Sequence, residues 1–260
     1  MDVYLINLDR RGDRLQAMQE TFDRIGLPFI RIPAVDGMLM SQKEPDWVYS
    51  LTPGEIGCYL SHKKCIELIA TSQNEYGVVL EDDVQFSVGV ERYLTDMNWI
   101  PKGADIVKLD TCGHLVHIKH IVELPDARIR LGRLLSPHVG AAAYIISREA
   151  AKKLLSLLDD MNIPIDRLLF THDRGVLNNM IVCQAIPALC QQSGSPSTIN
   201  LDRDIWIQKQ VKSARPKLLQ RIFREVKRPF KAVLYNTISG SSRLYRRVRM
   251  GKHWIRVPFG

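Results

Sequence analysis

A short apolar run that ends in three consecutive carboxylates constrains this chain more than any other feature. Val78–Leu80 has the composition of a buried strand, and Glu81–Asp83 follows it directly. Adjacent negative charges repel one another, by several kcal/mol for a pair ~4 Å apart at an effective dielectric near 20. The strand must therefore end where a cation, a basic partner or water reaches the carboxylates. The alternative to a cation site is a solvated acidic turn.

Around this run, apolar residues alternate between the spacing of strands and the spacing of helices. Thr52–Glu55 has a capping-box pattern with proline at the first helical position, and Ser147 is placed to cap a later helix. The alternation predicts an α/β domain with a mostly parallel sheet, in which ligands bind beyond the carboxyl ends of the strands. The predicted strands are 3–8, 29–32, 78–80, 106–109 and 141–146, and the predicted helices are about 15–25, 53–71 and 148–158.

The positive charge of the chain is confined to its C-terminal part. Residues 203–260 hold 16 Lys and Arg against 2 Asp and Glu, which leaves a balance of −6 for residues 1–202 of a chain whose net charge is +8. This change predicts a domain over 1–202 and a basic extension over 203–260. We find no apolar run of the ~20 residues that a membrane span needs and no signal peptide at the start, so we expect a cytoplasmic protein with reduced cysteines.

Apolar and basic residues are interleaved in the extension. Residues 216–228 place an apolar stripe against Lys and Arg at helical spacing, with Pro229 behind it, and residues 243–256 mix arginines with aliphatic and aromatic side chains. This composition is typical of a helical segment that lies on an anionic membrane. The alternatives are a helix packed on the body and a nucleic-acid-binding tail, and we do not favour nucleic acid as a partner.

Arginines follow the first predicted strand. Asn7 is followed by Arg10, Arg11 and Arg14 at the opening of a helix, where guanidinium groups and backbone N–H groups can hold a diphosphate. The alternative is a solvated helix face. Cys112, His114, His117 and His120 have a spacing that can be drawn as a zinc site, but we favour a polar excursion between strands, because one short run would have to fold back tightly on itself.

Five motifs in the correct order resemble glycosyltransferase family 25, the bacterial lipopolysaccharide glycosyltransferases, to which collagen galactosyltransferase domains are related. They are VYLINLDRRGDR (3–14), PAVDG (33–37), LTPGEIGCYLSH (51–62), VVLEDDV (78–84) and AYIISREAAKKLL (143–155), and the resemblance covers about residues 1–200. It implies a GT-A fold, an inverting mechanism, a UDP-sugar donor that is often UDP-galactose, and a divalent cation, usually Mn²⁺ with Mg²⁺ as the substitute.

The resemblance also implies roles for individual residues. Asp83 would bind the metal most directly, with Glu81 as a further ligand, and Glu81 and Asp82 would face the nucleotide ribose or the water ligands of the metal. Glu81 departs from a strict Asp-x-Asp motif, because glutamate occupies the first position. The remaining donor-binding residues would be Asn7, Leu8, Arg10, Arg14, Ala34, Asp36, Gly37, Ser61 and His62. A satisfied helix histidine is the alternative for His62.

An inverting transfer needs a carboxylate that takes the proton of the attacking hydroxyl. Asp166 matches the Pro-x-Asp pattern of the family, although a helix N-cap is a competing explanation for it. Asp173 is the second candidate, since two turns of one helix would place both carboxylates on the same face. Lys108 and Asp110, at another strand end, are candidate contacts of the acceptor or the diphosphate.

Two hypotheses about function follow. The first is a metal-dependent glycosyltransferase that moves a hexose to a lipid-linked lipopolysaccharide or lipooligosaccharide core at the inner face of the bacterial inner membrane, held there through residues 216–260. The second is a non-enzymatic membrane- or nucleic-acid-associated adaptor with a nucleotide-binding body. An amphipathic extension also allows a homodimer.

Overall fold

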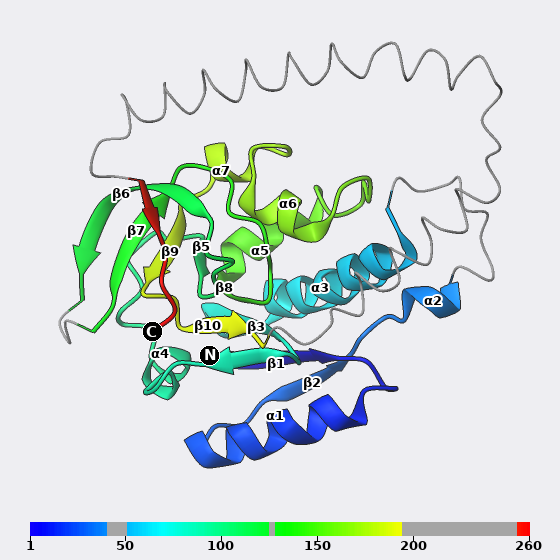
Figure 1. The fold of residues 1–260 in the computed structure, drawn as a ribbon. Coiled ribbons are helices and arrows are strands. Elements are labelled where there is room, and N and C mark those ends of the chain that lie inside the picture. Colours follow the sequence, from blue (N-terminus) through cyan, green and yellow to red (C-terminus); the bar gives the residue numbers. More distant parts are fainter. Residues whose placement is uncertain (41–50, 125–127, 194–253) are drawn as a thin grey trace, which may run out of the picture.

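The computed structural model describes residues 1–40, 51–124, 128–193 and 254–260 (Figure 1). The helices are α1 (Gly12–Ile25), α2 (Gly37–Met40), α3 (Pro53–Thr71), α4 (Glu91–Thr95), α5 (Arg148–Leu155), α6 (Ile165–Phe170) and α7 (Val176–Asn179). The strands are β1 (Asp2–Asn7), β2 (Ile30–Pro33), β3 (Tyr76–Glu81), β4 (Val84–Phe86), β5 (Ile106–Lys108), β6 (Leu115–Glu123), β7 (Arg130–Leu134), β8 (Ala143–Ser147), β9 (Val182–Ile186), β10 (Cys190–Gln192) and β11 (Trp254–Arg256). The predicted α/β class is confirmed.

The described strands form one large sheet in the order β11-β6-β7-β9-β5-β8-β3-β1-β2, and β4 pairs with β10 beside it. Strands β2, β1 and β3 are parallel, and so are β5 and β9. Strand β8 runs antiparallel between β3 and β5, and β6 and β7 form an antiparallel pair. The sheet is therefore mixed, and the predicted parallel arrangement holds only for β2, β1 and β3 and for the β5–β9 pair. Apolar spacing reveals that a segment is a strand, but its direction depends on the connections around it.

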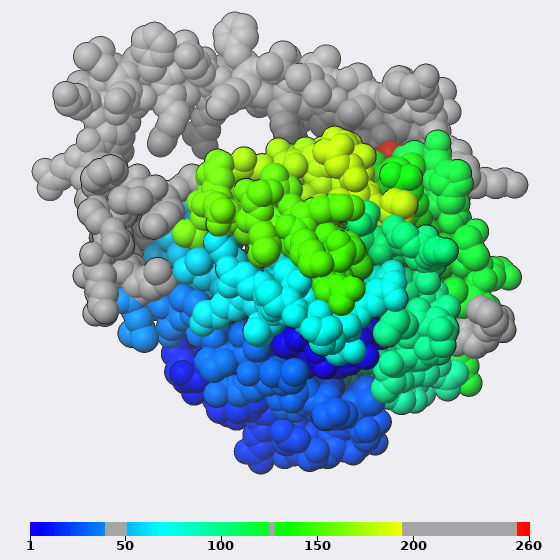
Figure 2. Space-filling view, turned by 180° about the vertical axis from the view of Figure 1, so that it is seen from behind, coloured from blue at the N-terminus to red at the C-terminus, as the bar shows by residue number. Residues whose placement is uncertain are grey.

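Helices cover both faces of the sheet. Tyr4 and Ile6 of β1 point into a core shared with α3, α5, α6 and α7, whereas Val3 and Leu5 point into a second core shared with α1 and α4. Figure 1 shows α1 on one face and α3 with α5 on the other, and Figure 2 shows α3 between the N-terminal elements and the segment of α6 and α7. This two-sided burial explains why β1 and β3 are almost continuously apolar.

Helix α3 forms because its first turn is capped as the sequence predicts. The Thr52 side chain accepts a hydrogen bond from the Glu55 N–H, and the Glu55 carboxylate accepts one from the Thr52 N–H at 2.9 Å. Pro53 occupies the first turn, where its missing N–H costs nothing. The cap fixes where the helix begins, and Cys58 and His62 in the following turns lie beside Glu81 at the end of β3.

Two glycines let the loop after β2 contact the start of α3. A Cβ on Gly37 would lie 1.6 Å from the Pro53 carbonyl oxygen, and a Cβ on Gly57 would lie 2.4 Å from the Val35 carbonyl oxygen. Neither position can accept a side chain without a backbone shift. Gly37, a predicted donor contact, therefore also packs closely against the first turn of α3.

The last seven residues return to the sheet. Strand β11 pairs with β6, Val257 is buried, and Ala188 forms a β-bridge with Phe259. The predicted helical extension does not include Trp254–Arg256, because these residues form a strand at the edge of the sheet. The predicted helix at 216–228 and the rest of 203–253 lie outside the described residues. None of the described helices is long and apolar enough to span a bilayer.

Candidate functional site

A cleft of about 440 Å³ opens where β1, β2 and β3 end and α3 begins. Parallel strands bring their carboxyl ends to one edge of the sheet, so the motifs after β1, β2 and β3 meet there. Most of the predicted site residues line this cleft, and they are Leu8, Arg10, Arg14, Ala34, Asp36, Gly37, Ser61, His62, Glu81, Asp82, Asp83 and Asp166. Asn7, Lys108, Asp110 and Asp173 do not line it.

Asp82 is held from two sides beside the end of β3. The Asn7 side chain donates to Asp82 Oδ2 at 2.7 Å, and Arg14 Nη1 donates to Asp82 Oδ1 at 2.9 Å. Asn7 is buried, and its amide also donates to the Arg11 carbonyl. The predicted donor contact by Asn7 is therefore wrong in this geometry, because Asn7 orients Asp82 from behind.

Asp83 keeps one carboxylate oxygen free. Its Oδ2 accepts from Arg14 Nη1 at 3.2 Å, whereas Oδ1 is buried without a hydrogen-bond partner among the described residues. Arg14 Nη2 is likewise buried and unpartnered within the described structure. Burial and the neighbouring Glu81 and Asp82 carboxylates raise the pKa of Asp83 to about 6, although Arg14 acts in the opposite direction. Two residues that line the cleft and pair with each other thus each keep one buried polar atom without a hydrogen-bond partner in the described part of the chain.

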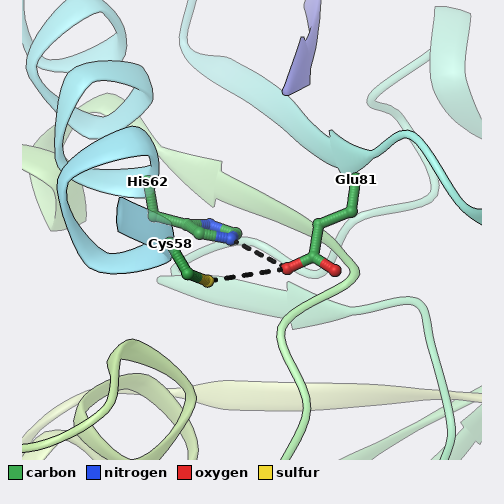
Figure 3. A group of neighbouring side chains, drawn as sticks. All are labelled: Cys58, His62 and Glu81. Carbon is green, nitrogen blue, oxygen red and sulfur yellow. Dashed lines mark hydrogen bonds and ion pairs between the residues drawn. The ribbon is translucent and has the colours of Figure 1, made fainter. Parts of the chain in front are cut away.

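Glu81 faces α3 rather than Arg14 (Figure 3). His62 Nε2 lies 3.2 Å from Glu81 Oε1, Cys58 Sγ lies 3.8 Å from the same oxygen, and the Gln192 side chain donates to Oε2 at 3.2 Å. Burial favours the neutral acid, but the hydrogen bonds from His62 and Gln192 and the charge of His62 outweigh it and lower the pKa of Glu81. His62 is fully buried, and its Nδ1 lies 3.0 Å from the Tyr144 hydroxyl. The predicted placement of His62 beside the carboxylates is confirmed.

The cleft rim is held by local pairs. Arg10 Nε donates to Asp36 Oδ2 at 2.6 Å, and Asp36 Oδ1 accepts from the Met38 N–H. Ser61 Oγ accepts from the Val35 N–H at 2.8 Å and donates to the Gly57 carbonyl. Ser61 therefore ties the loop after β2 to α3, and Arg10 is the more exposed of the two charged rim residues.

The two candidate bases have different positions. Asp166 lies in the first turn of α6, where Oδ2 accepts from the Gly140 N–H at 3.0 Å, and the N-cap position belongs to Pro164. Helix α6 ends at Phe170, so Asp173 lies beyond it and pairs with Arg167 at 2.6 Å. The prediction that both carboxylates share one helix face is wrong because the helix is too short. The structure brings Asp166 alone into the cleft.

Lys108 and Asp110 form a buried pair behind the cleft. The Lys108 ammonium donates to Asp110 Oδ1 at 2.8 Å and to the Gly140 carbonyl, and it lies 4.3 Å from the centre of the Phe170 ring. Both side chains are at most 1% exposed. The predicted contact of these residues with an acceptor or a diphosphate is therefore wrong. Instead they clamp the Gly140 peptide, whose N–H orients Asp166.

We expect Lys108→Met to lower the free energy of unfolding by about 3–5 kcal/mol, because it leaves the Asp110 carboxylate buried without its cation. Equilibrium urea unfolding measures this loss. The double variant Lys108→Met/Asp110→Leu removes both charges and should regain most of the lost stability. A single variant as stable as the unmodified protein would contradict the clamp.

Residues 112–120 do not bring a set of metal ligands together in the described structure. Cys112 contacts the Val139 carbonyl, and the His117 ring stacks on Trp254 with 5.1 Å between ring centres. The described residues bring together a different group, Cys58, His62 and Glu81, whose ligand atoms all lie within 4.8 Å of one another.

Sequence reasoning missed Cys58, although its i, i+4 spacing from His62 on a capped helix was a usable signal. Gln192 carried no signal, because only the pairing of β10 with β4 places it there.

Comparisons with known proteins identify a family and several relatives. A family model described as "Glycosyltransferase family 25 (LPS biosynthesis protein)" matches residues 1–169. The lipooligosaccharide biosynthesis protein lic2B of Haemophilus influenzae is 27% identical over 275 residues, which cover 98% of each chain. The lacto-N-neotetraose biosynthesis glycosyltransferase LgtB of Neisseria meningitidis serogroup B is 30% identical over 218 residues, which cover 74% of this chain and 75% of LgtB.

Proposed function

The chain belongs to glycosyltransferase family 25, and from this premise we propose that it transfers a hexose, typically galactose, from a UDP-sugar to a lipopolysaccharide or lipooligosaccharide core, with inversion and with a divalent cation. Two relatives that span most of the chain support the acceptor class through their names, since lic2B is a lipooligosaccharide biosynthesis protein and LgtB a lacto-N-neotetraose biosynthesis glycosyltransferase. The cleft supports the cation and the diphosphate, whereas the uridine donor and the inversion are expectations from the family.

The pair of unsatisfied atoms at Asp83 and Arg14 carries this proposal. A buried carboxylate oxygen without a partner has a desolvation cost that a bound cation removes, and carboxylate oxygens suit Mn²⁺ or Mg²⁺. The adjacent free guanidinium nitrogen fits a phosphate oxygen. The residues present thus fit a metal–diphosphate pair, with Asp83 as the direct ligand, Arg14 on the phosphate and Arg10 at the rim.

The bound cation would supply charge neutralisation for the departing diphosphate. The chain's own residues do the rest. Arg14 donates to the diphosphate as negative charge grows on the phosphate oxygens. Asn7 orients Asp82, and Asp82 in turn holds Arg14. Asp166 takes the proton of the attacking hydroxyl, and the Gly140 N–H holds its carboxylate toward the cleft. Because Asp166 and the Asp83–Arg14 pair lie on different elements of one cleft, the hydroxyl can approach opposite the leaving group.

A panel of nucleotide sugars tests this function. Each UDP-sugar is supplied with Mn²⁺ or with EDTA, and release of UDP is measured with and without a lipooligosaccharide core as acceptor. We expect release with UDP-hexoses, a requirement for the cation and stimulation by the core. A protein that binds UDP but releases none from any sugar, with or without the core, would instead indicate the non-enzymatic adaptor.

Membrane attachment through residues 216–260 stays a prediction from the sequence. Replacing Arg243, Arg246, Arg247 and Arg249 with glutamine should weaken binding to phosphatidylserine vesicles by about a thousandfold at low salt, since each basic residue contributes about 1 kcal/mol near an anionic surface. Vesicle sedimentation measures the change. Substitution is preferable to truncation because residues 254–260 complete the sheet. Undiminished sedimentation would contradict the membrane role of these arginines.

A further inference from the structure

Cys58, His62 and Glu81 converge on one point beside the cleft (Figure 3). Cys58 and His62 lie four residues apart, on one face of α3, and Glu81 lies at the end of β3. The set combines a thiol, an imidazole and a carboxylate, which are the three ligand types that Zn²⁺ accepts. We infer that this group is a binding site for Zn²⁺ or a similar borderline-soft divalent ion, separate from the hard cation at Asp83.

The distances fit a tetrahedral ion. With Zn²⁺ bonds of about 2.0–2.3 Å, neighbouring ligand atoms lie about 3.3–3.8 Å apart. His62 Nε2 and Glu81 Oε1 are 3.2 Å apart, Cys58 Sγ and Glu81 Oε1 are 3.8 Å apart, and every pair lies within 4.8 Å. Three protein ligands leave a fourth position, which faces the cleft because Cys58 and Glu81 line it.

The neighbours of the three ligands are arranged to orient them. The Tyr144 hydroxyl lies 3.0 Å from His62 Nδ1, so it accepts from Nδ1–H when Nε2 binds an ion. The Gln192 side chain donates to Glu81 Oε2 and leaves Oε1 for the ion. Binding breaks the Cys58 S–H bond and forms a sulfur–metal bond, and the proton passes to solvent through the cleft. The described structure leaves Cys58 unpaired with any other cysteine.

An ion at this point would block the donor site. It would add a charge and a coordination sphere between α3 and Glu81, on the wall of the cleft in which the nucleotide sugar is proposed to lie. This consequence rests on the proposed function, whereas the binding site itself does not. Zn²⁺ is therefore expected to inhibit transfer, in competition with the donor, while Mn²⁺ supports it.

Cobalt spectroscopy of the full chain tests the binding site without any assay of activity. Co²⁺ should give a thiolate-to-cobalt charge-transfer band that Zn²⁺ removes. Cys58→Ser should abolish the band and weaken Zn²⁺ binding, measured by calorimetry, at least about a hundredfold. The matched control is Cys112→Ser, which removes an exposed thiol outside the group and should leave both signals unchanged. Glu81→Gln should weaken Zn²⁺ binding and keep the band.

The outcomes separate the two proposals. A band that is absent from the unmodified protein, that survives in Cys58→Ser, or that disappears in Cys112→Ser overturns the zinc site. If the band behaves as expected but no UDP-sugar is turned over, the zinc site stands and the proposed function fails. If transfer occurs, Cys58→Ser should resist Zn²⁺ at concentrations that inhibit the unmodified enzyme, and equal inhibition of both overturns the link between the site and activity.

Discussion

Asp83→Asn should lower the rate of sugar transfer about a thousandfold and leave the protein folded. The substitution keeps the shape of the side chain but removes the negative charge of a carboxylate that lines the cleft. A cation that neutralises a leaving diphosphate contributes several kcal/mol to the transition state, and about 4 kcal/mol corresponds to the expected loss. Steady-state assays over a range of Mn²⁺ concentrations would measure it.

The same substitution should not destabilise the fold. The pKa of Asp83 is about 6 in the folded protein and about 3.9 in an unfolded chain. A carboxyl whose pKa is raised on folding lowers stability at pH values above the folded pKa, because the folded state disfavours the charged form. At pH 7 the neutral amide removes this penalty, and Arg14 keeps its bond to Asp82. The melting temperature of Asp83→Asn should therefore equal or exceed that of the unmodified protein.

Asp159→Asn is the matched control for the loss of one negative charge. Asp159 is 77% exposed and pairs with Lys63, away from the cleft. This variant should keep full activity and an unchanged requirement for Mn²⁺. If Asp83→Asn instead retains unmodified turnover at the same Mn²⁺ concentration, then Asp83 is not the metal ligand and the carboxylates have a structural role only.

The site could be predicted from the sequence where local rules decide the outcome. The start of α3 follows from a capping box and a proline, and the structure begins the helix at Pro53 as predicted. Glu81 and Asp83 reach the cleft because the carboxyl ends of parallel strands share one edge of a sheet. Both inferences need only the residues of one segment and the general geometry of a helix or a strand.

The rest depends on contacts between distant segments. Lys108 was a plausible surface contact at a strand end, yet it is fully buried beside β8 and the Phe170 ring of α6. The residues around position 108 in the sequence give no sign of this burial. The pairing of Trp254 with His117 of β6 could not be predicted, because the two residues lie 137 positions apart in the sequence. Gln192 reaches Glu81 only through the β4–β10 pair. Burial and long-range pairing therefore decided which polar residues reach the site.

Asp166→Asn should lower the turnover number by about 10²–10⁴, the range that a positioned general base contributes. The amide keeps an oxygen that can accept from the Gly140 N–H but cannot take a proton from the acceptor hydroxyl. Binding of UDP with Mn²⁺, measured by calorimetry, should stay unchanged, because the metal and phosphate contacts are assigned to Asp83 and Arg14. The fall should therefore appear in the turnover number and not in the affinity for the donor.

Asp173→Asn is the control for Asp166→Asn, because it also removes one negative charge near α6 but not the proposed base. Asp173 lies outside the cleft and pairs with the exposed Arg167, so its substitution should change turnover by less than about threefold, in keeping with the small contribution of exposed ion pairs. If Asp173→Asn proves the slower enzyme, the base lies outside α6 and the proton must leave the acceptor by another route.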